Sequence, residues 1–240
     1  KVGNTTRNNY RRLIASLNNK MVDDEISTKR VVNSISKLRE KPRKNKTYTK
    51  DQLKDIKSWL EINDPYLHSF IKFIMYGFLR EIDVVRIRIK HINLEDKIIR
   101  LETKTEVLST ILIIQKLLPE FEKLKIKNTD PNLFLFTKNN SPGEWEVEKE
   151  RSKVNHFITR FKKCKNALSL NEDYGLYSFK HTYIKDLYIN FLEQGQTPLE
   201  SKHKLMTITR HKTISSLEKY LRDIGALIPK DYSGDFSTDF

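Results

Sequence analysis

The sequence predicts a mainly helical protein with a small antiparallel three-stranded β-sheet, that is, an α+β fold. Apolar residues recur at the spacing of amphipathic helices along most of the 240 residues. Residues 91–114 differ, because the strand-like runs Ile98–Leu101 and Val107–Ile114 flank a polar segment in the manner of a β-hairpin. A hydrophobic content of 38% suffices to fill a core.

Two helices are predicted in the first 40 residues. One is centred on Tyr10–Leu17, and the second runs from Thr28 to Leu38 with its apolar residues at helical spacing. A basic, proline-containing stretch follows, Lys41-Pro42-Arg43-Lys44-Asn45-Lys46. This composition is typical of a linker, so residues 41–48 are expected to separate two domains.

Helix-start signals continue beyond the linker. Thr49 and Gln52 have the spacing of a capping box, and Asp64-Pro65 is typical of the first residues of a helix. The three-stranded sheet is expected next. After it, apolar spacing predicts helices near 115–126, 147–166, 178–193, 198–207 and 213–223.

Composition narrows the class of partner. A formal net charge of +14 and a pI near 9.6 favour a polyanionic partner, for which nucleic acid is the default. The single Cys164 excludes an intrachain disulfide and suits a reducing cytoplasm. No apolar stretch approaches the roughly 20 residues of a membrane span, and the six scattered histidines do not have the spacing of metal ligands. We therefore expect no membrane partner and no metal.

A histidine and a tyrosine near the carboxyl end say most about the chemistry of this protein. His211 precedes Tyr220 by nine residues, separated by a polar turn and the start of a predicted helix. A phenol in a strongly basic chain suggests attack on a phosphodiester. The alternative is that Tyr220, flanked by Leu217 and Leu221, is a packed amphipathic side chain.

Three further stretches carry candidate residues. Arg80 follows Gly77 and is predicted at the start of a helix. Lys104 falls near the tip of the predicted hairpin. Tyr177 and Lys180 lie one turn apart on a predicted helix, so they can point toward the same site. Each of the charged residues could instead be an ordinary surface charge.

In this order, the residues resemble the tyrosine recombinase family, or phage-type integrases, over roughly 47–225. The family has an arginine in a Gly-Leu-Arg-x-x-Glu setting, a hairpin lysine, a His-x-x-Arg helix start and a Gly-His pair followed by a nucleophilic tyrosine. This chain departs from that pattern at Asp83 for Glu, Tyr177 for His, Lys180 for the second Arg and Arg210 for Gly. Tyr-x-x-Lys followed by His looks like the variant of integrases of conjugative transposons and related mobile elements.

The resemblance implies a reaction and the parts that residues take in it. Tyr220 would attack DNA to form a covalent 3′-phosphotyrosine, with no nucleotide cofactor. Arg80, Lys180 and His211 would stabilise the charge on the phosphate oxygens. Lysine keeps the positive charge of arginine but lacks its bidentate fork, so the departure at Lys180 changes the chemistry.

Other residues receive supporting roles from the same resemblance. Lys104 would protonate the departing 5′-oxygen, and Tyr177 would donate a hydrogen bond to the scissile phosphate. Basic residues in and beyond the linker would contact DNA, mainly its phosphates. These residues are Arg43, Lys44, Lys46 and Arg210.

The resemblance also implies domains and partners. Residues 1–40 would be the carboxyl-terminal part of a helical, SAM-like core-binding domain, and 49–225 the catalytic domain; we expect the chain to be a fragment of a longer protein. The tail, 226–240, either docks in trans on a neighbouring protomer or is a disordered end. Expected partners are double-stranded DNA at recombination sites, a homotetramer on two duplexes and accessory DNA-bending factors, in a bacterial or phage-like cytoplasm.

Two other functions stay open from the sequence. One is a sequence-specific DNA-binding protein without catalysis, in which Lys180 and Arg210 record a lost site. The other is a type IB topoisomerase-like enzyme that nicks and reseals DNA as a monomer. Integration or excision of a mobile element is the favoured function.

Overall fold

The computed structural model describes residues 2–39, 46–101 and 109–227 of the chain. It divides into two compact units, Lys1–Lys44 and Asn45–Phe240. The boundary between the units falls inside the predicted linker, 41–48. Each unit is described by itself.

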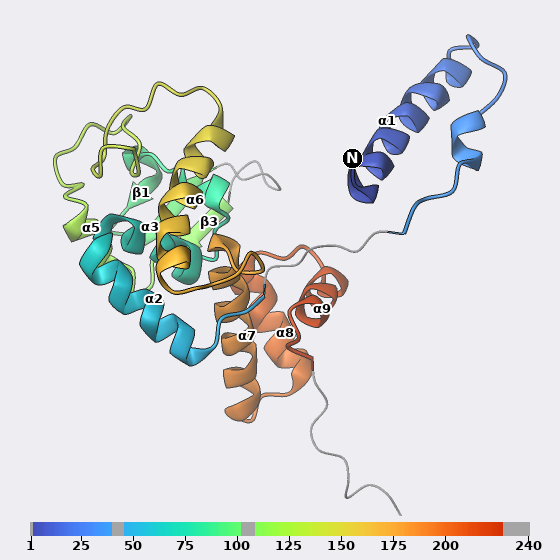
Figure 1. Ribbon diagram of the computed structural model, residues 1–240. Coiled ribbons are helices and arrows are strands. Elements are labelled where there is room, and N and C mark those ends of the chain that lie inside the picture. Colours follow the sequence, from blue (N-terminus) through green and yellow to red (C-terminus); the bar gives the residue numbers. More distant parts are fainter. Residues whose placement is uncertain (1, 40–45, 102–108, 228–240) are drawn as a thin grey trace, which may run out of the picture. The chain divides into compact units, whose positions relative to one another are not determined.

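In the first unit, residues 2–39 form one long helix and one short helix. Helix α1 (Asn4–Asp23) corresponds to the first predicted helix, and the 3₁₀ helix η1 (Val31–Ser34) follows (Figure 1). The prediction of a helix over Thr28–Leu38 is wrong, because only this one turn forms. Asn8 holds the backbone of Leu38 instead: its Nδ2 donates to the Leu38 carbonyl at 2.8 Å, and its Oδ1 accepts from the Leu38 amide at 3.0 Å.

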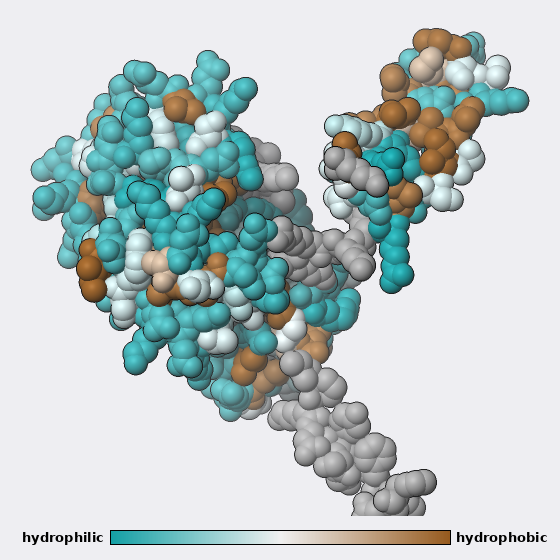
Figure 2. Space-filling model, in the orientation of Figure 1, coloured by the Kyte–Doolittle hydropathy of each residue, from teal (hydrophilic) through white to brown (hydrophobic). Residues whose placement is uncertain are grey.

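Apolar side chains of the first unit are largely exposed. Brown, hydrophobic atoms alternate with hydrophilic ones along this unit in Figure 2. Among the described residues of this unit, Asn8 alone is buried on α1, and no residue of η1 is. The exposed apolar residues are Val2, Tyr10, Leu13, Ile14, Leu17, Ile26, Val31, Ile35 and Leu38.

The second unit begins with three consecutive helices. Helix α2 (Lys50–Asn63) starts at the predicted Thr49–Gln52 capping box, and the Asp64 carboxylate caps α3 (Pro65–Tyr76), as predicted. Helix α4 (Glu81–Val84) starts at Arg80, again as predicted. Gly77 is the C-cap of helix α3, and the backbone turns at Phe78, where φ is 47°. A Cβ at Gly77 would lie 2.7 Å from the Phe73 carbonyl oxygen, so a larger residue would collide with α3.

The predicted sheet follows the 3₁₀ helix η2 (Ile89–His91). Strands β1 (Ile92–Asn93), β2 (Ile98–Leu101) and β3 (Ser109–Leu112) pair in the antiparallel order β1-β2-β3. Ile99 pairs with Ile92 on one side and with Ile111 on the other. The side chains of Ile99 and Ile111 are buried, so one face of the sheet belongs to the core.

Five helices follow within the described residues 113–227: α5 (Leu118–Lys123), α6 (Glu150–Ala167), α7 (Leu176–Glu193), α8 (Pro198–Thr209) and α9 (Ile214–Asp223). Figure 1 shows α7, α8 and α9 side by side, and α7 packs on α8 and α8 on α9. A mainly helical fold with a three-stranded antiparallel sheet is confirmed.

Two hydrophobic clusters hold the second unit together, and α7 spans both. Its first half contributes Leu176 and Phe179 to the large cluster around α2, α3, α6 and the sheet. From Ile184 onward it contributes Ile184, Tyr188 and Phe191 to a smaller cluster with α8 and α9. Residues in the middle of α7 therefore lie where the two clusters meet. Among the described residues, no helix is both long enough and apolar enough to cross a membrane.

Candidate active site

A cavity of about 370 Å³ opens between the two clusters and gathers most of the predicted site residues. Six of its lining side chains were predicted from the sequence: Arg80, Tyr177, Lys180, Arg210, His211 and Tyr220. They come from α4, α7, α9 and the turn between α8 and α9. Thus four separate segments bring two phenols, one imidazole and several cations to a single cavity.

Helix α9 fixes the position of Tyr220. The Thr213 hydroxyl accepts a hydrogen bond from the Ser216 amide at 3.1 Å and caps the helix. Leu217 and Leu221 are fully buried on one side of α9. Tyr220 is partly buried beside the cavity, and its hydroxyl lies 2.7 Å from His181 Nδ1. The packing of α9 and the contact with His181 therefore both fix the position of the phenol.

The Tyr220 phenol is protonated at rest. Burial raises the pKa of Tyr220 above its ordinary value; Tyr177 adds to the shift and Arg80 opposes it. For Tyr220 to act as a nucleophile, a neighbouring group must take its proton.

Lys180 is buried and held by a backbone carbonyl. Its Nζ donates to the Phe78 carbonyl at 2.7 Å, and the residue is 6% exposed. Burial, together with the nearby Arg210 and Arg80, lowers the pKa of Lys180 to about 7, while Asp83 and Glu81 oppose the shift. An anion entering the cavity would offset this repulsion and favour the charged form.

Arg210 occupies a backbone conformation that favours glycine. It follows the end of α8 with φ 60° and ψ 41°, in the left-handed region. Its Nη2 donates to the carbonyls of Gly77 and Phe78, each at 3.0 Å. Arg210 stands where the recombinase pattern has glycine. The arginine lacks the conformational freedom of glycine, but its side chain holds the turn after α3.

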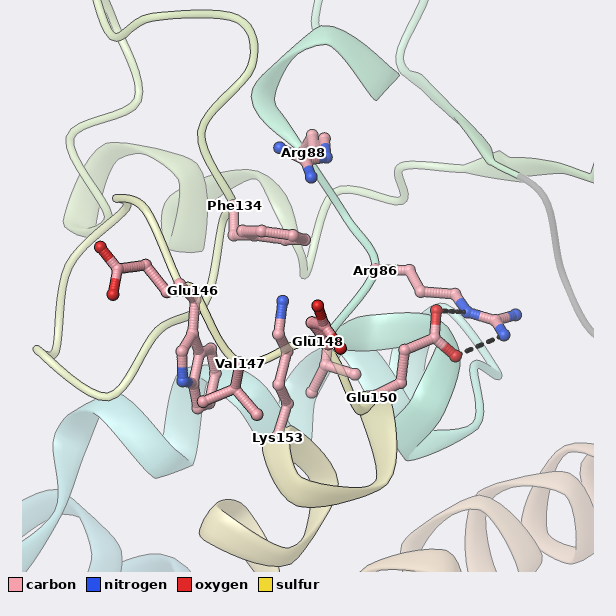
Figure 3. A pocket seen from close by; sticks show the side chains of 10 residues that line it. Arg86, Arg88, Phe134, Glu146, Val147, Glu148, Glu150 and Lys153 are labelled. Carbon is pink, nitrogen blue, oxygen red and sulfur yellow. Dashed lines mark hydrogen bonds and ion pairs between the residues drawn. The ribbon is translucent and has the colours of Figure 1, made fainter.

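A chain of charged groups lies behind Arg80. The buried Asp83 carboxylate accepts the Arg80 amide at 3.3 Å and lies 3.8 Å from the Arg80 guanidinium. Arg86 lies 3.9 Å from the same carboxylate. Arg86 also donates two hydrogen bonds to Glu150, both at 2.6 Å, drawn as dashed lines in Figure 3. Asp83 therefore joins the cavity to the start of α6.

The hydrogen bonds of His211 determine its tautomer. Its Nδ1 lies 2.6 Å from Thr209 Oγ1, and the single hydroxyl proton of Thr209 goes to the Leu205 carbonyl at 2.7 Å. Nδ1 therefore carries a proton and donates it to Thr209. Burial, with Lys180 next in effect, lowers the pKa of His211 to about 4. His211 is therefore neutral at neutral pH.

Tyr177 lies against His181 and above Lys180. Its ring centroid is 4.7 Å from that of His181 in an edge-to-face arrangement, and Lys180 Nζ is 5.8 Å from the Tyr177 ring centroid. Burial raises the pKa of Tyr177, while Arg80 opposes the shift. Its hydroxyl is therefore a hydrogen-bond donor near neutral pH.

Not every predicted residue joins the cavity. Lys104, Arg43 and Lys44 lie outside the described residues. Ser109, the first residue described after 102–108, lines the cavity. Lys46 lies elsewhere and pairs with Asp173, its Nζ 2.8 Å from Oδ2.

The sequence interpretation noted the histidine after Lys180 but gave no role to this residue, His181, whose Nδ1 lies 2.7 Å from the Tyr220 hydroxyl. The available signal was its spacing, since His181 follows Tyr177 by four residues and therefore shares its face of α7. The turn carbonyls of Gly77 and Phe78 were missed too. They carry no side-chain signal, because any residue has a carbonyl.

A second cavity of similar size, about 380 Å³, contains none of the predicted site residues. Figure 3 shows Arg88 and Lys153 on opposite sides of the Phe134 ring, with their charged groups 3.8 and 3.6 Å from its centroid. These contacts explain how Lys153 is accommodated with 5% exposure. Among the described residues, no group of three or more His, Cys, Asp or Glu side chains could hold a metal ion.

Comparison with solved structures relates this arrangement to known proteins. No sequence-family model matches the chain, and no curated protein sequence does. The Tn1549 transposon integrase in complex with circular intermediate DNA is similar at 15% identity and a TM-score of 0.64, over 91% of this chain and 75% of that one. A lambda integrase dimer bound to a COC′ core site has 12% identity and a TM-score of 0.68, over 93% and 75%.

XerA recombinase is also similar, with 11% identity and a TM-score of 0.53 over 74% of this chain and 60% of that one. These three proteins are tyrosine recombinases. Identities this low carry an argument about the fold alone. The chain therefore has the fold of the tyrosine recombinase catalytic domain.

Proposed function

We propose that this protein is a site-specific DNA recombinase that cuts and rejoins strands through a covalent 3′-phosphotyrosine on Tyr220. One observation carries the proposal. Tyr220 lies in a cavity with Arg80, Lys180, Arg210 and His211 while its hydroxyl contacts His181. A phenol amid fixed cations suits attack on a phosphodiester, and the shared fold supports the same class of reaction.

The cations would stabilise the charge that develops on the non-bridging oxygens. Arg80 is presented by the start of α4, and the Phe78 carbonyl pre-positions Lys180 and Arg210. These groups need little reorganisation when the phosphate enters, which is the condition for strong electrostatic stabilisation. The phosphate charge would also raise the pKa of Lys180 and of His211 toward their ordinary values.

We propose Lys104 as the acid that protonates the departing 5′-oxygen. Support comes from its place between β2 and β3, together with Ser109 at the cavity wall. Double-stranded DNA would be the substrate, with four protomers on two duplexes and accessory DNA-bending factors. The Tn1549 integrase, solved with circular intermediate DNA, favours integration or excision of a mobile element as the natural reaction.

Covalent capture tests the proposal. The protein is incubated with a randomised pool of nicked duplexes, in which cleavage releases a short 5′-ended fragment and traps the enzyme on DNA. Adducts are recovered after denaturation, sequenced and passed through further rounds. We expect a nuclease-trimmable adduct for the parent and none for Tyr220→Phe. A duplex that both proteins bind, but neither joins covalently, would favour the non-catalytic DNA-binding function.

A supercoiled plasmid separates recombination from topoisomerase activity. We expect little relaxation of a plasmid without a selected site, and joining of two duplexes that both carry one. Relaxation without any selected site, and no exchange between sites, would favour the type IB topoisomerase-like function instead.

A further inference from the structure

We infer that His181 is a catalytic residue that accepts the Tyr220 proton during attack. This role rests on the proposed function and extends it to a residue outside the predicted set. The hydrogen bond of 2.7 Å between Tyr220 Oη and His181 Nδ1 carries the inference. Within the described residues, no other hydrogen bond to this hydroxyl is found.

Other groups near the phenol are unsuited to accept its proton. The Arg80 guanidinium has no acceptor, and the Tyr177 hydroxyl is itself a protonated phenol. The His211 ring lies 5.2 Å from the Tyr220 ring; its Nδ1 donates to Thr209, and among the described residues its Nε2 makes no hydrogen bond to the Tyr220 hydroxyl. Lys180 donates to a carbonyl and belongs to the phosphate side of the cavity. His181 therefore has both the position and the basic nitrogen that are needed to accept the Tyr220 proton.

Helix α7 holds the imidazole rigidly. His181 is 9% exposed, in the middle of an 18-residue helix whose two halves are anchored in separate clusters. The Tyr177 ring packs edge-on against it. A base held this firmly can meet the tyrosine without a change of backbone.

The electrostatic surroundings keep His181 neutral before the substrate binds, so that its ring has a lone pair available for a proton. Burial lowers the pKa of His181 to about 4, Lys180 adds to this effect, and Asp223 opposes it. Neutral His181 has a free lone pair at Nδ1 when its proton is on Nε2. A bound phosphodiester would reduce the repulsion from Lys180 and make imidazolium formation easier.

The step balances in protons and electrons. The Tyr220 oxygen forms a bond to phosphorus while the phosphorus–O5′ bond breaks. The phenol proton passes to His181 Nδ1, and Lys104 supplies the proton of the new 5′-hydroxyl. In the reverse step, imidazolium returns its proton to Tyr220, so each exchange regenerates the starting state.

The experiment measures the rate of adduct formation on a nicked duplex selected with the parent protein. His181→Asn places an amide oxygen near Nδ1, so it keeps a hydrogen-bond acceptor without a basic nitrogen. We expect both His181→Asn and His181→Ala to slow adduct formation by about 100-fold or more. Free imidazole should restore much of the rate to His181→Ala, because it can enter the vacated space and take the proton.

A duplex with sulfur at the 5′-bridging position separates the two proton transfers. The thiolate leaves without an acid, so this substrate should rescue Lys104→Ala but leave both His181 variants slow. A His181→Asn protein with the parental rate, or a His181→Ala protein that is slow but insensitive to imidazole, would overturn the role of His181 alone. Absence of any adduct with the parent would overturn the proposed function and this role together. Thermal unfolding of each variant verifies that it is folded.

Discussion

At the scale of single residues, the site depends on cations held close together before any substrate arrives. Lys180 and Arg210 donate to the same carbonyl of Phe78, at 2.7 and 3.0 Å. Phe78 itself has φ 47°, in the left-handed region, which costs about 1–2 kcal/mol for a residue with a side chain. The hydrogen bonds from Lys180 and Arg210 thus stabilise an unfavourable backbone conformation at Phe78. In return, the Phe78 carbonyl positions both cations.

Burial of Lys180 makes stability depend on pH. Its pKa falls to about 7 in the folded protein, whereas an unfolded lysine titrates near about 10.4. Between these values the unfolded chain binds more protons, so this group makes the free energy of unfolding rise with pH, by up to about 1.4 kcal/mol per unit. Lys180→Met should remove this slope and be more stable than the parent near pH 6, with an advantage that shrinks toward pH 9.

Urea unfolding of parent and variant across this range measures the difference. The matched control is Lys212→Met, since Lys212 lines the same cavity but is exposed. Parallel pH profiles for the parent and Lys180→Met would show that Lys180 stays charged in the folded protein.

Arg210 offers a second residue-scale test. Removing its side chain loses two hydrogen bonds, but only glycine also relieves the left-handed backbone. Arg210→Gly should therefore unfold with a free energy about 1 kcal/mol higher than that of Arg210→Ala. Chemical denaturation of the two variants provides the comparison. Equal stabilities would mean that the backbone at 210 adopts another conformation once the guanidinium is gone.

At the scale of elements, local signals predicted most of the second unit. Thr49–Gln52 and Asp64-Pro65 were recognisable because a cap is a contact between residues close in sequence. His181 was not recognised, because its contact with Tyr220 depends on how α7 and α9 pack. The apolar residues of Thr28–Leu38 recur at helical spacing, but its β-branched and short polar residues lower the helix propensity of the segment. In addition, two hydrogen bonds from the Asn8 side chain favour an extended backbone at Leu38. Periodicity alone cannot weigh these competing contacts.

Helix α9 provides the element-scale prediction. Thr213→Ala removes the hydroxyl that accepts the Ser216 amide, so it should lower the free energy of unfolding by about 1 kcal/mol. Because α9 carries Tyr220, its first-turn amides should exchange hydrogen faster and adduct formation should fall. Thr213→Ser is the control and should behave like the parent. Unchanged exchange in Thr213→Ala would mean that Leu217 and Leu221 hold the helix without the cap.

At the scale of the whole molecule, the net charge of +14 affects the affinity for DNA, whereas the residues of the cavity affect cleavage. Contacts with phosphates supply affinity for any duplex, and their number determines how strongly salt weakens binding. The cations of the cavity would act on one phosphate at a time, whereas the basic residues of the linker would act on other phosphates. Binding and cleavage should therefore respond to different substitutions.

The linker provides the final prediction. If Arg43 and Lys44 each neutralise one phosphate, replacing both with Gln should make the slope of log K against log salt less negative by about 1.8. Lys46→Gln should have a smaller effect, because Lys46 already pairs with Asp173 and binding DNA must first break that pair. The control replaces the exposed Lys162 and Lys163 on α6 and should leave the slope unchanged. Fluorescence anisotropy with a duplex of unrelated sequence measures all four proteins. If the control made the slope less negative by as much as the linker variant does, the net charge of the molecule, and not the linker, would determine binding.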